Sequence, residues 1–252
     1  MMSCKMATKF VFLLTFLFLV LVFELGSARL TSGVIPALPK EEVSALNAVM
    51  DSKSYNYCND TELMHENLFV VCNCSYEKNT VCHVTKISIL NADLNIATIN
   101  GEVGKLKFLE SITIKGTKLS GSIPNDLGNL SALKYLVLSR NSLNGSIPES
   151  LGQLRALEVL DLYNNFLTGS IPSSLANLFS LESLDLSYNL LSGQIPQALG
   201  NLSNLRGMYL FQNNLSGNIP PELGSLSRLD TLFTGKLPEN YANLTSRRLV
   251  VQ

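Results

Sequence analysis

The dipeptide Ile-Pro returns at a constant interval from the middle of the chain onward. It occupies positions 123–124, 147–148, 171–172, 195–196 and 219–220, so that consecutive copies are always 24 positions apart. A fixed period of this length is typical of repeat proteins, in which each repeat forms one coil and buries its apolar side chains by stacking on its neighbours. The period therefore predicts a solenoid of stacked coils.

One repeat is represented by the stretch from Leu133 to Pro148, which follows the frame L-x-x-L-x-L-x-x-N-x-L-x-G-x-I-P. Its alternating leucines place one side of a short strand inward, because side chains alternate along a strand. Each repeat thereby adds one strand to a parallel sheet. We predict an α/β solenoid, a right-handed superhelix with this parallel β-sheet on its concave side. The predicted strands lie near residues 110–114, 134–138, 158–162, 182–186 and 206–210.

The asparagine of the frame recurs where the chain leaves each strand, at positions 141, 165, 189 and 213. Its amide can bond backbone groups that no regular sheet ladder reaches, so we expect the stacked coils to form an asparagine ladder. Gly145 permits a turn conformation that is closed to most residues, and the proline after it directs the return segment. On that segment Leu151 and Leu154 are expected to line the convex side with a second apolar row.

Weaker copies of the frame extend the array toward the N-terminus, so residues 84–244 are assigned to the repeats. The last repeat is shortened, because Pro238 follows Pro220 too early to complete the period of the other copies. We expect this gap to reflect a truncated product or gene model, and residues 245–252 to form an uncapped tail.

Residues 1–28 have the features of a secretory signal peptide. Lysines precede an apolar run from Phe10 to Phe23, and small residues at Gly26 and Ala28 suit cleavage after Ala28. An uncleaved anchor is the alternative, although the apolar run is shorter than the roughly 20 residues that cross a bilayer. We therefore expect passage through the secretory pathway and no membrane span in the mature chain.

Residues 29–83 are expected to form a disulfide-stabilised N-terminal cap. Residues 39–52 begin with proline and acidic residues and have apolar side chains three to four positions apart, which predicts a short amphipathic helix. Four cysteines clustered between positions 58 and 82 of an exported chain indicate two disulfides, and the Cys72-x-Cys74 spacing is too tight for the usual zinc knuckle. Of three connectivities, we favour the one that closes two short loops: Cys58–Cys72 and Cys74–Cys82.

The repeat frame resembles the plant-specific leucine-rich repeat of receptor-like kinases and related extracellular proteins. The stretches from Ile35 to Leu46 and from Val71 to Thr85 are similar to the cap of the subclass in which the repeats precede a malectin-like domain, a transmembrane helix and a kinase. This sequence contains no malectin-like domain, membrane span, Gly-rich loop, H-R-D or D-F-G motif, so the resemblance does not imply an enzyme. It implies a module of cell-surface signalling in the apoplast or at the outer face of the plasma membrane.

Composition and motifs argue against nucleic-acid binding, a metal site and catalysis. Nineteen basic against 20 acidic residues give a net charge of −1, which removes the long-range attraction that a nucleic-acid binder depends on. The only histidines, His65 and His83, lie in or beside the cap, and we expect no metal and no cofactor. Asp161 and Asp185 occupy equivalent strand positions, a spacing that would suit paired carboxylates of a glycosidase. A repeated polar surface is the simpler interpretation, so we expect no catalytic residue.

Seven Asn-x-Ser/Thr sequons predict N-glycosylation of an exported chain. They begin at Asn59, Asn73, Asn129, Asn144, Asn201, Asn214 and Asn243. Three of them, at positions 129, 201 and 243, are expected on the convex return segments, where a glycan leaves the concave side open.

The outward strand positions remain as the candidate binding surface. Aromatic side chains over several coils beside mixed charges suit recognition of a peptide, a glycan or a protein partner such as a co-receptor. The candidate ligand-binding residues are Tyr135, Val137, Asp161, Tyr163, Asp185, Tyr209 and Phe211, and the other outward positions include Ser139 and Ser187. The alternatives are an inactive truncated product and a secreted inhibitor similar to those of polygalacturonases, which carry related repeats but have a second cap.

Overall fold

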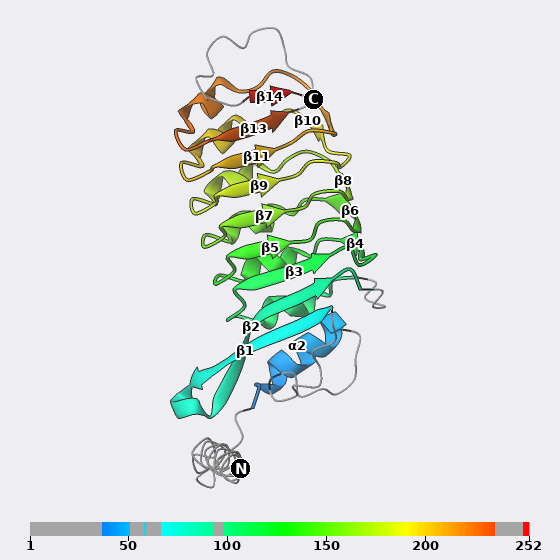
Figure 1. The fold of residues 1–252 in the computed structure, drawn as a ribbon, viewed down its shortest axis with the longest axis vertical. Helices are drawn as coiled ribbons and strands as arrows, with labels where there is room; N and C mark the ends of the chain where they lie inside the picture. The colour runs from blue at the N-terminus through cyan, green and yellow to red at the C-terminus, as the bar shows by residue number, and fades with distance from the viewer. Residues whose placement is uncertain (1–36, 51–57, 59–66, 93–97, 235–248, 252) are drawn as a thin grey trace, which may run out of the picture. The chain divides into compact units, whose positions relative to one another are not determined.

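The computed structural model describes residues 37–50, 58, 67–92, 98–234 and 249–251. The signal peptide expected over residues 1–28, the sequons at Asn59 and Asn243, His65 and most of the shortened last repeat lie outside these residues. From Pro36 onward the chain forms one unit, in which successive coils stack on one another (Figure 1).

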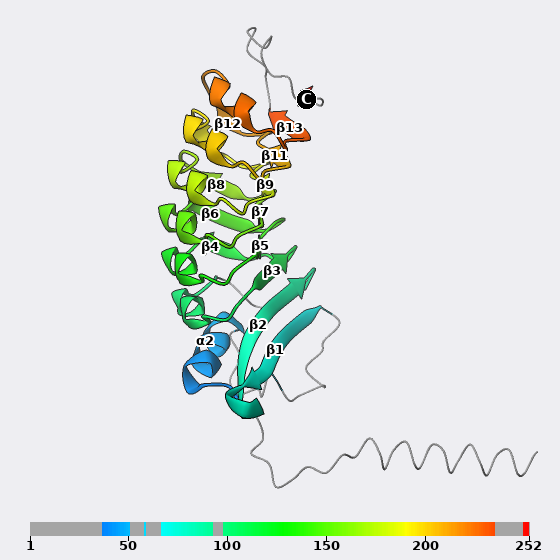
Figure 2. The ribbon, with the colours of Figure 1, turned by 90° about the vertical axis from the view of Figure 1, so that its left-hand side faces the viewer.

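Nine of the described strands form one sheet along one side of the stack (Figure 2). The first two strands pair in an antiparallel hairpin, and all later neighbours run parallel. The predicted right-handed solenoid with a concave parallel sheet is confirmed, and the repeat strands lie within the predicted ranges apart from Lys115. In sheet order the strands are β1 Leu68–Tyr76, β2 Val81–Leu90, β3 Ser111–Lys115, β5 Tyr135–Val137, β7 Val159–Asp161, β9 Ser183–Asp185, β11 Gly207–Tyr209, β13 Thr231–Thr234 and β14 Leu249–Val251.

Short 3-10 helices lie on the opposite side of the stack (Figure 2). In the five coils with an Ile-Pro dipeptide the helix follows directly after the proline, whose φ lies between −72° and −60°. Leu151 and Leu154 are fully buried here, as the predicted convex apolar row requires. The six helices are η3 Gly101–Lys105, η4 Asn125–Asn129, η5 Glu149–Gln153, η6 Ser173–Asn177, η7 Gln197–Asn201 and η8 Pro221–Ser225.

Between the strands and the 3-10 helices, short additional strands form two side sheets along one edge of the stack (Figure 1). These strands were not predicted from the sequence, because they are very short and most of them are rich in Ser, Asn and Gly. One sheet contains β4 Ser120–Ser122, β6 Ser142–Ser146 and β8 Phe166–Thr168; the other contains β10 Ser192–Gly193 and β12 Asn214–Leu215.

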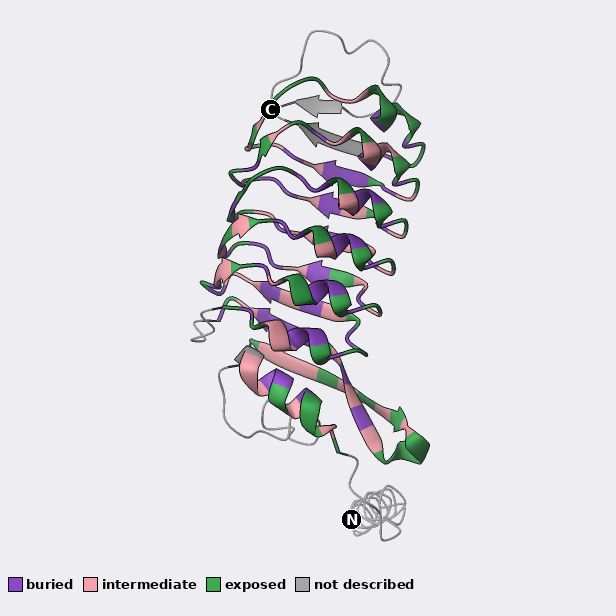
Figure 3. Cartoon of the chain, turned by 180° about the vertical axis from the view of Figure 1, so that it is seen from behind, coloured by how far each residue is buried: buried purple, intermediate pink, exposed green. Residues whose placement is uncertain are grey.

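The core is a continuous cluster that consists mainly of leucine and isoleucine side chains. Buried residues recur along the strands and 3-10 helices of successive coils (Figure 3). Leu136, Leu160 and Leu184 are fully buried and pair in register across the sheet. Every coil therefore buries its apolar side chains against the coils before and after it, as the period predicts.

The predicted asparagine ladder is present at the turns after β5, β7, β9 and β11. Asn165 donates from Nδ2 to the carbonyl oxygens of Leu138 (3.0 Å) and Leu162 (3.1 Å). Its Oδ1 accepts the backbone N–H of Leu143 at 3.0 Å. One amide thus joins its own coil to the preceding one, and the asparagines at 141, 189 and 213 make equivalent bonds.

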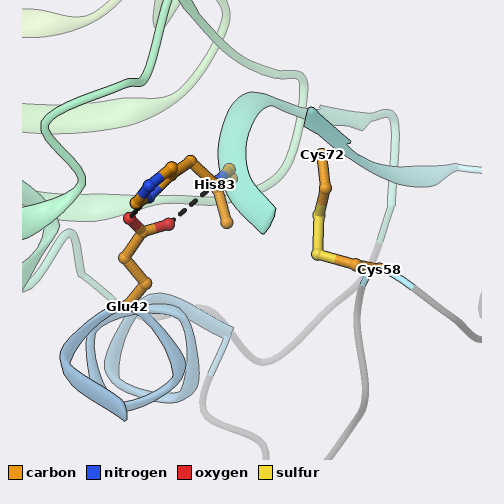
Figure 4. A network of polar contacts seen from close by, with 5 residues as sticks. Glu42, Cys58, Cys72 and His83 are labelled. Atoms are coloured by element: carbon orange, nitrogen blue, oxygen red, sulfur yellow. Dashed lines mark hydrogen bonds and ion pairs between the residues drawn. A yellow bond between two sulfur atoms is a disulfide. The ribbon is translucent and has the colours of Figure 1, made fainter. Parts of the chain in front are cut away.

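The cap consists of the helix α2 Lys40–Met50, which lies within the predicted range 39–52, and the β1–β2 hairpin, which was not predicted. Two disulfides are formed, Cys58–Cys72 and Cys74–Cys82, and they are the pairs favoured from the loop lengths. Glu42 on α2 is only 5% exposed and joins the helix to β2 (Figure 4). Its Oε1 lies 2.5 Å from His83 Nδ1, and its Oε2 accepts the N–H of Val84 at 2.9 Å.

The described part of the expected uncapped tail, residues 245–252, contains a short strand. Residues 249–251 form β14, which pairs in parallel with β13, with Leu249 opposite Leu232. The sequence Leu-Val-Val favours a strand, and the edge of β13 offers unpaired backbone groups to it.

Candidate binding surface

The outward side chains of β3, β5, β7, β9 and β11 form a surface that we call the sheet face. Each strand contributes alternate residues to it, while the intervening leucine, isoleucine or, in β11, methionine points into the core. Tyr135 is exposed, and Val137, Asp161 and Asp185 are half-buried between their neighbours on adjacent strands. Positions predicted as candidate binding residues therefore do face outward in these three strands.

Four side chains just beyond the strand ends form a continuous series across four coils, which we call the aromatic row: Arg140, Tyr163, Tyr188 and Phe211. The Arg140 guanidinium carbon lies 5.7 Å from the centre of the Tyr163 ring. The Tyr163 and Tyr188 ring centres are 5.4 Å apart, and those of Tyr188 and Phe211 are 5.3 Å apart. Both ring pairs cross at 80°, the edge-to-face geometry that aromatic quadrupoles favour.

Tyr188 is the member of the aromatic row that sequence reasoning missed. It lies in the turn after β9 with φ 53°, while Tyr163 and Phe211 occupy a different position of the repeat. The same backbone conformation recurs at Arg140, Asn164 and Gln212, directly before each ladder asparagine. This left-handed turn places Tyr188, which is 44% exposed, between the two predicted aromatic residues. In the sequence, the feature that could have identified Tyr188 is its position directly before the ladder asparagine Asn189.

Asp161 and Asp185 are register partners on β7 and β9, as their equivalent repeat positions require. Asp161 accepts the hydroxyl of Ser139 (2.8 Å) and the N–H of Tyr163 (3.0 Å), and Asp185 accepts the N–H of Ser187 (3.0 Å) and its hydroxyl. These bonds fix the chain as it leaves the strands. The expectation that Ser139 and Ser187 face outward was wrong, because both are fully buried against the carboxylates.

Burial raises the pKa of Asp185 above its usual value, and the charge of Asp161 raises it further. The two bonds from Ser187 act in the opposite direction, because they favour the ionised carboxylate. The pair is thus a half-buried anionic feature in the middle of the sheet face, beside the aromatic row.

Charged residues occupy the other end of the strands, one position before each of them. Lys134 Nζ lies 2.9 Å from a Glu110 oxygen, Arg206 Nε lies 3.5 Å from Glu182, and the Tyr135 hydroxyl donates to Glu158 at 2.7 Å. The opposite charges of these exposed side chains largely cancel, and exposed ion pairs contribute little to the stability of the fold. The sheet face is therefore aromatic at one strand end and charged at the other.

Tyr209 has a different environment from the other predicted aromatic residues. A Cβ atom added to Gly207 would meet the Tyr209 ring at 2.9 Å, so the ring lies back over its own strand. Tyr163 and Phe211 are thus brought together in the aromatic row, while Tyr135 bonds at the charged end and Tyr209 covers β11.

The described sequon asparagines are all exposed and lie outside the sheet face. Asn129 and Asn201 end η4 and η7 on the return segments, where they were expected. Asn144 and Asn214 lie on β6 and β12 of the side sheets, and Asn73 lies on β1 of the cap.

Two further properties concern the part of the chain that the structure describes. No helix in it is long and apolar enough to cross a membrane. Within the same residues, His, Cys, Asp and Glu form no group of three or more that could hold a metal ion.

Comparison with known proteins matches a family model described as a leucine-rich repeat region over residues 122–249, and a single leucine-rich repeat over residues 108–130. No curated protein matches the sequence.

Solved structures with the same fold include two plant receptor ectodomains. The ectodomain of the membrane receptor kinase GASSHO1/SCHENGEN3 from Arabidopsis thaliana, in complex with Casparian strip integrity factor 2, matches with a TM-score of 0.70 and 26% identity, over 84% of this chain and 26% of that chain. The Arabidopsis receptor kinase HAESA ectodomain, in complex with an IDA peptide hormone ligand, matches with a TM-score of 0.60 and 29% identity, over 82% of this chain and 33% of that one.

A plant ice-binding protein also matches, with a TM-score of 0.63 and 26% identity over 80% of this chain and 66% of its own. The chain therefore spans between 26% and 66% of the length of these three structures.

Proposed function

This chain belongs to the leucine-rich repeat proteins, and from that premise we propose that it is an extracellular recognition module that binds a peptide on its sheet face. The aromatic row supplies the main contact in this proposal. The proposed location, in the secretory pathway and then outside the cell, is supported by two disulfides, which persist in oxidising compartments.

The observation that carries the proposal is the continuity of the aromatic row over four coils. With strands about 4.8 Å apart, the row is about 14 Å long, which is the length of roughly four extended residues. Consecutive rings cross at 80°, so they present alternating faces and edges. Such a surface suits the separate side chains of a peptide better than the flat ring of a sugar.

The fold alone does not select this function, because a plant ice-binding protein shares it. The two matched receptor ectodomains hold their named ligands as complexes, and one of these ligands is a peptide hormone. Together with the resemblance of the repeat and the cap, this supports a role in cell-surface signalling, in which a co-receptor is a further candidate partner.

The test uses peptides selected from a displayed random library against the secreted full-length chain, with binding measured by calorimetry. Replacing both Tyr163 and Phe211 with alanine is expected to weaken binding by about 1–2 kcal/mol per residue, as for other buried aromatic contacts. The thermal midpoint should fall by only about 2–4 °C for each ring contact that is lost.

Phe179→Ala is the control, since Phe179 is an exposed phenylalanine that lies between η6 and β9, outside the sheet face. It should leave the affinity unchanged, as should Gln153→Ala on the return side. Unaltered affinity in the Tyr163/Phe211 double variant would contradict the proposal and place the peptide site elsewhere.

A further inference from the structure

Phe166 is the most exposed of the large apolar side chains in the described part of the chain, at 55%. It begins β8, on a side sheet away from the aromatic row. The repeat frame does not require an aromatic residue there, because the core residue of this strand is the neighbouring Leu167, which is fully buried. Phe166 therefore contributes little to the folded coil and is available to another group.

The neighbour of Phe166 across the side sheet is Asn144 on β6. The two residues are register partners in parallel strands. Side chains of such partners project from the same face, and the strands lie about 4.8 Å apart. Asn144 is exposed and begins the sequon Asn144-Gly145-Ser146, so a sequon asparagine lies directly beside an exposed phenyl ring.

We propose that Asn144 carries an N-linked glycan whose first N-acetylglucosamine packs against the Phe166 ring. In the transfer step, a bond forms between Asn144 Nδ2 and the anomeric carbon of the sugar, and the bond from that carbon to a lipid-linked diphosphate breaks. The amide nitrogen loses one proton and the lipid diphosphate leaves, without any change of oxidation state. The attached sugar has an apolar face of C–H groups, which covers the ring.

The surroundings of Phe166 favour this occupant over a protein partner. On the other side of Asn144 the register partner is the small Ser122, which leaves room for the sugar. The exposed apolar residue on the next coil is Leu190, whose N–H bonds to the carbonyl of Leu167 at 2.8 Å. The exposed apolar area of Phe166 and Leu190 together is well below the few hundred Å² that mark a protein docking site.

The described residues include a comparable sequon on the other side sheet, and no aromatic register partner is found for it among them. Asn214 lies on β12 of the other side sheet and begins the sequon Asn214-Leu215-Ser216. Its register partner is Ser192, which is exposed. Ser192 lies on the preceding coil and corresponds to Ser122 beside Asn144. Asn214 therefore matches Asn144 in this serine neighbour, but it has no aromatic register partner among the described residues.

The experiment uses the full chain secreted from plant cells, with sequon occupancy determined by glycopeptide mass spectrometry. Ser146→Ala removes the glycan at Asn144 without changing the asparagine. We expect it to lower the thermal midpoint by about 2–4 °C, the shift that corresponds to one aromatic contact in a chain of this length. In a Phe166→Ser background the same substitution should have no effect, because the contact is already absent.

The matched control is Ser216→Ala, which removes the glycan at Asn214 and should leave the midpoint unchanged. Hydroxyl-radical oxidation gives a local measurement: Phe166 should become more reactive in Ser146→Ala, with Phe179 as the unchanged reference.

The proposal depends on passage through the secretory pathway, which is part of the proposed function, and the outcomes separate the two. If no sequon carries a glycan, the secretory part of the proposed function fails as well. If other sequons are occupied and Asn144 is not, only the present proposal fails. If Ser146→Ala lowers the thermal midpoint equally with and without Phe166, the sugar does not pack on the ring. Unchanged oxidation of Phe166 in Ser146→Ala would show the same.

Discussion

At the scale of single residues, Asp185 links the geometry of the sheet face to pH. Its pKa is raised in the folded chain, chiefly by burial, so the folded state binds more protons than the unfolded state above about pH 4. The stability contributed by this group is therefore present at low pH and is lost as the pH rises through the folded-state pKa.

We accordingly expect Asp185→Asn to be more stable than the original chain at neutral pH, because asparagine keeps an acceptor for Ser187 and carries no buried charge. The gain should shrink as the pH is lowered toward about 3, where the aspartate is protonated too. Thermal unfolding across this range measures it, and Asp230→Asn, which removes an exposed charge outside the pair, is the control. A gain that is independent of pH would show that ionisation of Asp185 is not its cause.

Residue roles that repeat were predictable from the sequence, and roles set by one local conformation were not. Asn165 has a counterpart at the same position of every neighbouring repeat, so its buried bonds to two coils followed from the period. Tyr188 joins the aromatic row only because its turn is left-handed, and the burial of Ser139 depends on the carboxylate of Asp161 on the next coil. Neither feature can be recognised from the apolar periodicity of the frame.

At the scale of elements, the cap depends on one buried carboxylate. Glu42 connects α2 to His83 and to the backbone of β2, and the His83 ring stacks on Phe108 of the first repeat at 3.8 Å. The helix and the repeat strands were predictable from apolar periodicity. The β1 strand was not, because its pattern is interrupted by two cysteines whose partners fix it to other segments.

Replacing Glu42 with alanine should destabilise the cap by about 1–3 kcal/mol, since the N–H of Val84 then loses its buried acceptor. Hydrogen exchange is expected to accelerate at Val84 and along β2, while the amides of β7 and β9 remain protected, because each coil contacts only its neighbours. Glu41→Ala removes an exposed acidic residue of the same helix and should change little. Equal acceleration in all coils would show that the cap and the repeats unfold as one unit.

At the scale of the whole molecule, the coils should be interchangeable. Deleting residues 159–182 joins Glu158 to Ser183 and removes one complete repeat, so Asp185 then takes the place of Asp161 beside Ser139. We expect this variant to fold with lower stability, because one coil and one interface are lost. Deleting only residues 159–170 should abolish folding, since the leucines on either side of the junction no longer align. Circular dichroism and thermal unfolding distinguish these outcomes. If neither variant folds, the stability of the chain is not a sum of contributions from individual coils and their interfaces.

The two kinds of sheet also differ in how they combine neighbouring repeats. Tyr135 pairs with Val159, 24 positions further on, whereas Asn144 pairs with Phe166, only 22 positions further on. When a coil is duplicated in evolution, a side chain on the main sheet comes to lie beside its own copy, so uniform rows such as the leucines or the paired aspartates can lengthen. On a side sheet the same event places unlike positions of the repeat together. New pairings between different residue types, such as asparagine beside phenylalanine, can therefore arise there by copying alone, without a new mutation.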